Sequence, residues 1–298
     1  MGAAPITDFR ERIFMKKAIQ TAVLLVLCVA MTGCYGGAGK LSNEYVTIKK
    51  YVGVEVEEPA VEETTEEDID QVLDYMMDQY IRNNDLPEDT QVTDEIVKNG
   101  LSTTTDNVED FREEIRRQID ETKAESAQET LETRVWEKVI DNTTVEKWPK
   151  DRVQEVKENW IDQYEGYAAE YSMEYDEYME TIGLTEEDLE EAAKSSVKQE
   201  LIAELIAEKH ALKPTEEELQ TALEEYADEY MFTNVDLLLE AVPEEEMELL
   251  VLQDRVKAWL AERCETVEPS EKEQEEEAQE AEDEAEEKVE EEAVQQED

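Results

Sequence analysis

Apolar residues recur every three or four positions through most of the chain after residue 65, a spacing that predicts successive amphipathic helices. Thr-Glu-Glu-Asp stretches at 65–68 and 185–188 place a capping side chain and acidic residues where a helix begins. The longest expected helix runs from about Val108 to Ile140, and its middle is almost wholly polar, as in helices that bridge solvent. The other expected helices cover about 68–80, 148–171, 175–182, 185–212, 214–230, 234–241 and 243–260.

A shorter stretch, from Glu44 to Val61, alternates weakly between apolar and polar residues and is rich in β-branched side chains. This pattern predicts one or two strands that end at Pro59. Nine glycines, seven prolines and 37% charged residues among 298 are typical of long helices rather than of a β-rich domain. We therefore predict a mainly α fold, elongated rather than globular, with a small N-terminal β element.

The most apolar run of the chain is residues 19–31, which follow a basic cluster that begins at Met15. This apolar run is too short to span a bilayer. It leads into Met-Thr-Gly-Cys at 31–34, and small residues before a cysteine resemble a bacterial lipobox. A buried core helix is the alternative, but nothing else in the chain is as apolar. We expect residues 1–33 to be a lipoprotein signal peptide, and the basic cluster favours a true start at Met15.

In that class of signals the cysteine receives a diacylglyceryl group after the preceding peptide is removed, which implies a lipid on Cys34. Two acyl chains, at about 0.8 kcal/mol per buried methylene, hold a protein to a membrane far more firmly than one. The glycine-rich residues 34–43 then form a tether. The expected location is the extracytoplasmic face of the cell membrane.

The chain has 83 acidic and 28 basic residues, which gives a net charge of −55. Nucleic acid is excluded as a partner because binding phosphates requires basic residues, and the sequence has no basic stripe. The charge also argues against a body that lies flat on an anionic bilayer. Residues 265–298 are nearly all Glu, Gln, Ala and Asp, which predicts a disordered acidic tail.

No catalytic, metal-binding or cofactor-binding constellation is apparent, so we predict a protein that is not an enzyme and needs no cofactor. Of the three cysteines, Cys28 leaves with the signal and Cys34 is the lipid site, so Cys264 remains alone and no internal disulfide can form. Neighbouring carboxylates favour a packing role for Cys264 over a reactive thiol. His210 lies near a helix C-terminus, where a partial positive charge is favourable.

Aromatic residues and methionine form a stripe at helical spacing between residues 160 and 179, which is open to two interpretations. They are either the core of a helix pair or a surface that contacts varied polypeptides, because Tyr and Met offer large and adaptable contact areas. One helix pair can do both, with one edge buried and one exposed. The candidate binding residues are Trp160, Tyr164, Tyr167, Tyr171, Tyr175, Tyr178 and Met179, with Tyr226, Tyr230, Met231 and Phe232 as a second group.

Four phrases occur in order between Leu86 and Cys264: NVEDFREEIR at 107–116, YMETIGLTEEDL at 178–189, LIAELIAEKHALKPTEEEL at 201–219 and LQDRVKAWLAERC at 252–264. Together they resemble the C-terminal, substrate-binding domain of trigger factor, the bacterial folding chaperone. The resemblance implies a helical chaperone domain over 86–264, preceded at 44–85 by a β element and a linker helix, with unfolded or newly exported polypeptides as partners.

The departures from trigger factor matter as much as the resemblance. The ribosome-docking module has no counterpart, and only residues 81–85 stand where an FKBP-type isomerase domain would lie. Chaperones of the SurA and PrsA type, which act outside the cytoplasm, have a related helical fold. We therefore expect a lipid-anchored holdase that lacks ribosome binding. A peptidyl-prolyl isomerase-family protein and an acidic adaptor or structural lipoprotein are the alternatives.

Overall fold

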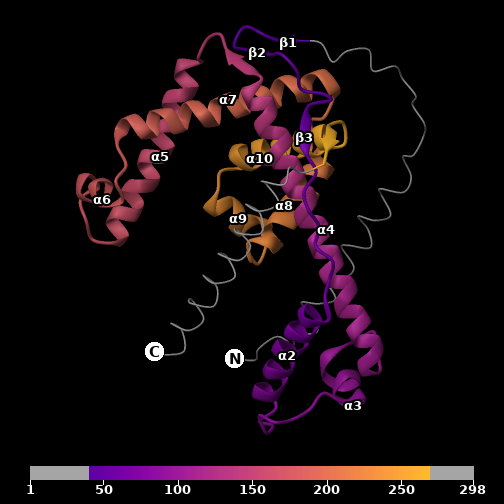
Figure 1. Ribbon diagram of the computed structural model, residues 1–298. Helices are drawn as coiled ribbons and strands as arrows, with labels where there is room; N and C mark the ends of the chain where they lie inside the picture. The colour runs from indigo at the N-terminus through magenta and orange to yellow at the C-terminus, as the bar shows by residue number, and fades with distance from the viewer. Residues whose placement is uncertain (1–39, 269–298) are drawn as a thin grey trace. The chain divides into compact units, whose positions relative to one another are not determined.

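The computed structural model describes residues 40–268, which divide into two compact units (Figure 1). Unit 1 contains residues 61–126, and unit 2 contains residues 40–60 and 127–268. The predicted mainly α fold with small N-terminal strands is confirmed. The predicted signal peptide, lipidated Cys34 and most of the tether and acidic tail lie outside the described residues.

Unit 1 is a helical unit formed by α2 (Glu66–Asn83), α3 (Asp94–Ile96), the π-helix η1 (Val97–Leu101) and the first half of α4 (Val108–Asp141). Every third or fourth residue of α2 points into a core shared with η1 and α4, as its spacing predicts. The buried core residues are Ile69, Leu73, Met77, Ile81, Val97, Leu101, Phe111 and Ile115.

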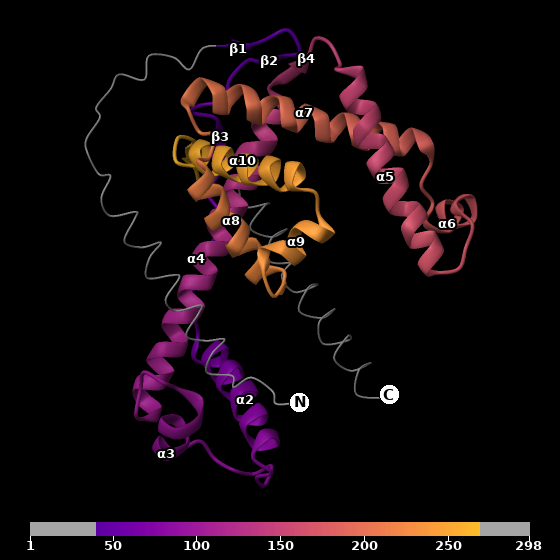
Figure 2. The ribbon, with the colours of Figure 1, turned by 180° about the vertical axis from the view of Figure 1, so that it is seen from behind.

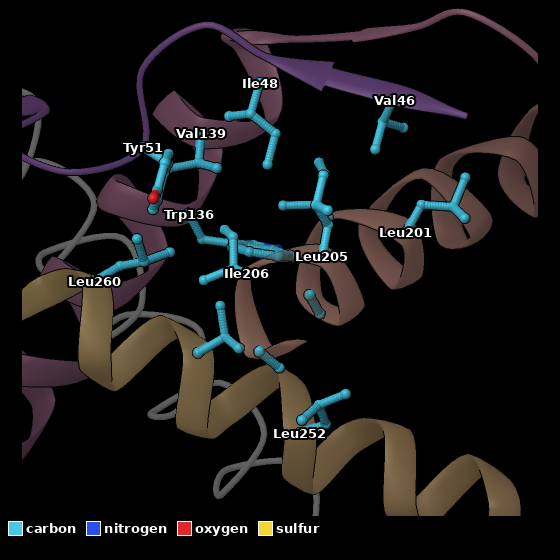
Figure 3. Close-up of a cluster of buried hydrophobic side chains, with 14 of the residues drawn as sticks. Val46, Ile48, Tyr51, Trp136, Val139, Leu201, Leu205, Ile206, Leu252 and Leu260 are labelled. Atoms are coloured by element: carbon cyan, nitrogen blue, oxygen red, sulfur yellow. The ribbon is translucent and has the colours of Figure 1, made fainter. Parts of the chain in front are cut away.

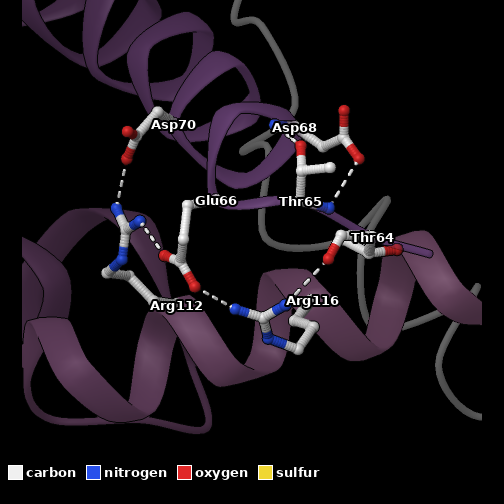
Figure 4. Close-up of polar contacts among 7 residues, drawn as sticks. All are labelled: Thr64, Thr65, Glu66, Asp68, Asp70, Arg112 and Arg116. Atoms are coloured by element: carbon white, nitrogen blue, oxygen red, sulfur yellow. Dashed lines mark hydrogen bonds and ion pairs between the residues drawn. The ribbon is translucent and has the colours of Figure 1, made fainter.

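Ion pairs fix the start of α2 against α4 (Figure 4). Thr65 and Asp68 form the expected capping box, each side chain accepting from the other's backbone N–H. Arg112 donates to Glu66 at 2.7 Å and to Asp70 at 2.5 Å, and Arg116 donates to Glu66 and, at 3.0 Å, to the carbonyl of Thr64. The two arginines therefore bind the acidic first turn of α2.

Unit 2 holds both small sheets. In the first, β2 (Val46–Ile48) pairs antiparallel with β1 (Leu41–Ser42) and with β4 (Thr143–Val145). In the second, β3 (Glu55–Glu57) pairs in parallel with β5 (Glu265–Val267). Strand β1 lies within the predicted tether and β5 within the predicted disordered tail, so both boundaries must be corrected by a few residues.

The division between units also differs from the predicted one, which separated 44–85 from 86–264. Val46 and Ile48 are fully buried against the second half of α4 and against α7 (Glu186–His210), whereas α2 packs with η1 and the start of α4. The β element and the linker helix therefore belong to different cores, because each buries its apolar face against a different half of α4.

The remaining helices of unit 2 are α5 (Lys150–Glu170), α6 (Tyr175–Ile182), α8 (Glu216–Glu229), α9 (Val235–Ala241) and α10 (Glu244–Ala261). Helix α7 is buried on several sides because it packs against α5, α10 and the first sheet. In Figure 3, Val46 and Ile48 lie on one side of α7, and Leu252 and Leu260 of α10 lie on the other. The C-terminal half of α7 is thus the centre of the core.

His210 lies at the end of α7, where the sequence led us to expect a partial positive charge on its ring, but its surroundings differ from that expectation. Its Nε2 lies 3.1 Å from the hydroxyl of Tyr51, and its ring packs against Trp259 with 4.2 Å between ring centroids. Burial, together with the nearby charges of Lys209 and Arg263, lowers the pKa of His210. The neutral ring is therefore favoured, because desolvation and two cations outweigh the partial negative charge of the helix end.

Candidate functional site

An open cleft of about 610 Å³ lies in unit 2 between α5, the middle of α7, the α9–α10 turn and α10. In both ribbon views α5 crosses the N-terminal part of α7, with α6 beyond it, and α10 runs beside the C-terminal part of α7 (Figures 1 and 2). The cleft is lined by Arg152, Val156, Asn159, Trp160, Asp162, Gln163, Ser196, Gln199, Glu200, Ala241, Val242, Pro243, Glu246, Leu249, Leu250 and Gln253.

A half-buried ion pair joins two walls of the cleft. Arg152 of α5 donates through Nε to both carboxylate oxygens of Glu200 on α7, at 3.0 and 3.1 Å, and Glu155 adds a second carboxylate. Burial raises the pKa of Glu200 despite the opposing effect of Arg152. Further out, Asn159 donates to Glu246 of α10 at 3.1 Å, which links α5 to the opposite wall.

The apolar part of the lining comes partly from residues that the sequence did not single out. Leu249 and Leu250 of α10 are half-buried, whereas the next two residues, Val251 and Leu252, are buried in the core. Four consecutive apolar residues cannot all face one side of a helix, so the run itself signals that part of α10 faces something other than the core. Val242 and Pro243 extend this wall.

Five of the six aromatic residues of the predicted stripe, all except Tyr175, are linked by ring contacts at α5 and α6. The ring centroids of Trp160 and Tyr164 are 6.3 Å apart, and the Tyr164 centroid lies 6.1 Å from that of Tyr167 and 6.5 Å from that of Tyr178. The rings of Tyr171 and Tyr178 stack with 5.9 Å between their centroids. Because α6 packs against α5, Tyr178 of α6 meets the rings of Tyr164 and Tyr171.

The exposure of the stripe varies along its length. Tyr171 is 70% exposed and Tyr167 is 39% exposed, while Trp160, which lines the cleft, is half-buried. Met179 is only 6% exposed and packs inside the α5–α6 pair, so it is not available as a surface contact. Tyr175 is half-buried, and its buried hydroxyl has no hydrogen-bond partner among residues 40–268. The stripe therefore contains both a buried member, Met179, and exposed members, Tyr167 and Tyr171.

The second predicted group lies at the end of α8 and in the turn that follows. Tyr226 is half-buried, and its hydroxyl donates a hydrogen bond to Asp254 of α10. Its ring stacks on that of Tyr230, with 6.1 Å between the ring centroids. Tyr230 is 56% exposed and Met231 is 88% exposed, whereas Phe232 packs against the α8–α9 core. None of these four lines the cleft, so the structure does not join them with Trp160 in a single lining.

Exposed apolar side chains are concentrated in the helical part of unit 2. Of the nine large apolar side chains that are exposed among residues 40–268, six lie on two parts of unit 2. We call these parts the α5–α6 patch, with Tyr167, Tyr171 and Ile182, and the α8–α9 patch, with Tyr230, Met231 and Leu237. Apolar surface that is not needed for the fold marks places where other molecules bind.

The described residues offer little basis for covalent or metal chemistry. Between residues 40 and 268, no three His, Cys, Asp or Glu side chains are grouped so as to hold a metal ion. Cys264 is half-buried against the core, and burial raises the pKa of its thiol. In the same residues no helix has the length and apolar character needed to cross a bilayer.

Comparison with known proteins places these features in a family. A search of curated proteins finds no match to this chain. The family described as bacterial trigger factor protein (TF) C-terminus matches residues 107–262, which is just over half of the chain and extends from the start of α4 to the end of α10. The matched segment includes every wall of the cleft and both patches. The chain therefore belongs to the trigger factor C-terminal family, whose domain is of the chaperone type.

Proposed function

We propose that this protein is an extracytoplasmic, lipid-anchored holdase that binds unfolded or newly exported polypeptides on unit 2. The family supports a chaperone-type function with unfolded polypeptides as clients. The anchor and the location are supported by the signal-like residues 1–33 and by Cys34. The observation that carries the proposal is the cleft itself, which is open, half polar and accompanied by two exposed apolar patches.

The energetics of such a surface suit transient binding. A client segment that buries about 400 Å² of apolar surface, at about 25 cal/mol per Å², gains about 10 kcal/mol. Association and ordering cost about 4–15 kcal/mol. The net affinity is therefore expected in the micromolar range, with fast release, as a holdase requires. The net charge of −55 favours basic clients and keeps loaded complexes apart.

An aggregation assay tests the chaperone part of the proposal. The full chain, added in severalfold excess to a refolding protein that aggregates, should suppress light scattering. The double variant Tyr171→Ser/Met231→Ser should suppress it less, because it removes the most exposed side chain of each patch. The matched control is Tyr75→Ser, which removes a side chain 64% exposed on α2 in unit 1. No suppression by the wild-type chain would contradict the proposal.

Membrane fractionation tests the anchor. The wild-type chain should remain in the membrane fraction after a high-salt wash, and Cys34→Ala should not, because the lipid has no other attachment site in the proposal. A Cys34→Ala chain that stays equally bound would exclude the lipid anchor while leaving the chaperone activity of unit 2 intact.

An isomerase is the alternative from the same wider family. In relatives with an isomerase domain, that β-rich domain would follow the helix that corresponds to α2. Here α2 leads through a short connection into α3, and the strands within residues 40–268 are only two or three residues long. We therefore expect a proline-limited refolding reaction to proceed no faster with the protein than without it. Acceleration by the purified chain would restore the isomerase interpretation.

A further inference from the structure

A group of lysines gathers at the end of unit 2 that carries the sheet β1–β2–β4. We define the lysine face as Lys40, Lys49, Lys50, Lys147 and Lys150, all of which are exposed. It is built from two segments about one hundred residues apart, which explains why the sequence shows no basic stripe. The pairing of β2 with β4 joins them, as do the hydrogen bonds from Lys49 N to the Asn142 carbonyl and from the Asn142 amide to the Lys50 carbonyl.

Most lysines of this face are not paired directly with a carboxylate, although Glu44, Asp141, Glu146 and Asp151 are exposed on the same two segments. Lys40, Lys49, Lys50 and Lys150 form no ion pair within residues 40–268, and Lys147 pairs with exposed Glu44 at 3.3 Å. Elsewhere in the described residues Lys157 and Lys194 have carboxylate partners, whereas Lys198, Lys209 and Lys213 form no ion pair. The chain has about three acids for every basic residue, so five exposed lysines that flank one strand pair, four of them without an ion pair, point to an anionic partner.

Aromatic rings accompany the lysines. Tyr45 and Trp148 are half-buried at the same end of unit 2, and Lys147 Nζ lies 5.3 Å from the Tyr45 ring centroid. Lysine, tyrosine and tryptophan together are typical of protein surfaces that meet lipid headgroups, because their apolar stems enter the interface while their polar ends remain hydrated.

The position of the face in the chain indicates which anionic partner it meets. Cys34 is six residues before Lys40, and six residues span at most about 20 Å. A lipid on Cys34 therefore holds β1 within that distance of the bilayer. We propose that the lysine face docks unit 2 onto anionic lipid headgroups, an inference that rests on the lipid anchor in the proposed function.

This docking fixes the direction of the cleft. On α7, Leu201 and Leu205 lie about half a turn away from the cleft residues Ser196, Gln199 and Glu200. In Figure 3 Leu201 and Leu205 lie on the side of α7 that bears Val46 of β2. The lysine face and the cleft thus lie on opposite sides of α7. A unit docked by its lysines presents the cleft away from the membrane, toward exported chains.

Docking at one end also explains how a protein with a large negative charge can be attracted to an anionic membrane. Residues 40–51 and 138–151 together carry six basic and four acidic residues, whereas the whole chain carries 28 and 83. An anionic surface attracts the first set and repels the rest over about a Debye length. The unit is therefore held end-on instead of lying flat.

Lysine footprinting on proteoliposomes tests the proposal. The lipidated full chain is reconstituted into neutral phosphatidylcholine vesicles and into vesicles with about 30% phosphatidylglycerol, and it is then acetylated with an N-hydroxysuccinimide ester. In the anionic vesicles Lys49, Lys50 and Lys150 should react about threefold more slowly, an effect reversed by high salt. Lys257 should react equally in both, because it lies on α10, which packs on the side of α7 opposite Val46 of β2.

A matched pair of variants extends the test. Lys49→Glu/Lys50→Glu should abolish the protection of Lys150 in anionic vesicles. Lys213→Glu/Lys257→Glu, which has the same net charge but changes residues at or beside α10, should retain it. Equal labelling of the lysine face in both vesicles, with the chain bound to each, would overturn the docking while sparing the anchor.

Two other outcomes would also overturn it. If protection is present in neutral vesicles and disappears when residues 269–298 are deleted, the lysine face binds the acidic tail of the chain itself. If the chain floats with neither kind of vesicle, both the docking and the lipid anchor are wrong. Flotation on neutral vesicles thus reports the anchor, and the footprint reports the docking.

Discussion

Replacing Arg152 by alanine tests whether the ion pair at the base of the cleft holds α5 against α7. The side chains of Arg152 and Glu200 are 21% and 15% exposed, so the variant leaves a half-buried carboxylate without its cation. Hydrogen bonds to charged groups contribute about 1.5–3 kcal/mol, and an uncompensated buried charge costs about 3–5 kcal/mol. Since some water remains, we expect a loss of about 2 kcal/mol in the free energy of unfolding.

Tryptophan fluorescence during urea unfolding measures this loss in unit 2 alone, because the four tryptophans, at positions 136, 148, 160 and 259, all lie in that unit. A loss of about 2 kcal/mol, at about 2 kcal/mol per molar urea, lowers the midpoint by about 1 M. Arg152→Ala/Glu200→Gln should recover most of it, because the unpaired charge is gone. Glu200→Gln alone is the control for the loss of the carboxylate.

The pH dependence provides an independent check. Burial raises the pKa of Glu200, so the folded state binds its proton more readily than the unfolded state does. The destabilising effect of the ionised group is therefore present at neutral pH and diminishes as the pH falls through the raised pKa. The deficit of Arg152→Ala should shrink between pH 7.5 and pH 5. Equal deficits at both pH values, together with strict additivity in the double variant, would refute the reasoning.

Three further predictions concern other parts of the chain. Because burial lowers the pKa of His210, unit 2 should lose stability as the pH falls below about 6.5, and His210→Phe should reduce this loss in fluorescence-monitored unfolding; an unchanged pH profile would contradict the buried neutral ring. Phe111→Ala should destabilise unit 1 by about 3–5 kcal/mol, seen as faster hydrogen exchange in α2, while the tryptophan midpoint stays within about 0.2 M; a fall of both together would show one cooperative unit. Met231→Ser should leave the unfolding midpoint unchanged, because its side chain is 88% exposed, and a marked fall would show that it packs against the fold.

The longer helices could be predicted closely from the sequence because they are amphipathic and most are marked at their start, whereas α3 and η1, of three and five residues, were not predicted. The capping boxes at Thr65 and Thr185 set the beginnings of α2 and α7, and Gly183 ends α6 with a positive φ of 72°. These signals are local, so the chain needs no tertiary information to show them.

The short strands could not be predicted in the same way. β4 and β5 have three residues each and exist because distant segments pair with them, β2 for the first and β3 for the second. Glu265, Thr266 and Val267 are all exposed, so the strand leaves no pattern of buried positions in the sequence. The segment therefore resembles the acidic residues that follow it.

The candidate site was predicted in part for a related reason. Helical spacing placed the aromatic residues of α5 and α6 on one stripe, but it could not show which edge the fold-back of α6 would cover. That packing buries Met179 and leaves Tyr171 exposed. The apolar wall formed by Leu249 and Leu250 depends on how α10 packs on α7, which the spacing of residues along one helix does not reveal.

Site-specific photo-crosslinking tests the central claim that unit 2 binds unfolded polypeptide through its patches and cleft. p-Benzoylphenylalanine placed at position 171 or 231, one in each patch, should crosslink to a permanently unfolded client, and the same residue at position 75 in unit 1 should crosslink little. The native form of that client should not crosslink at any of the three positions. Equal crosslinking at position 75, or none at 171 and 231, would contradict the account.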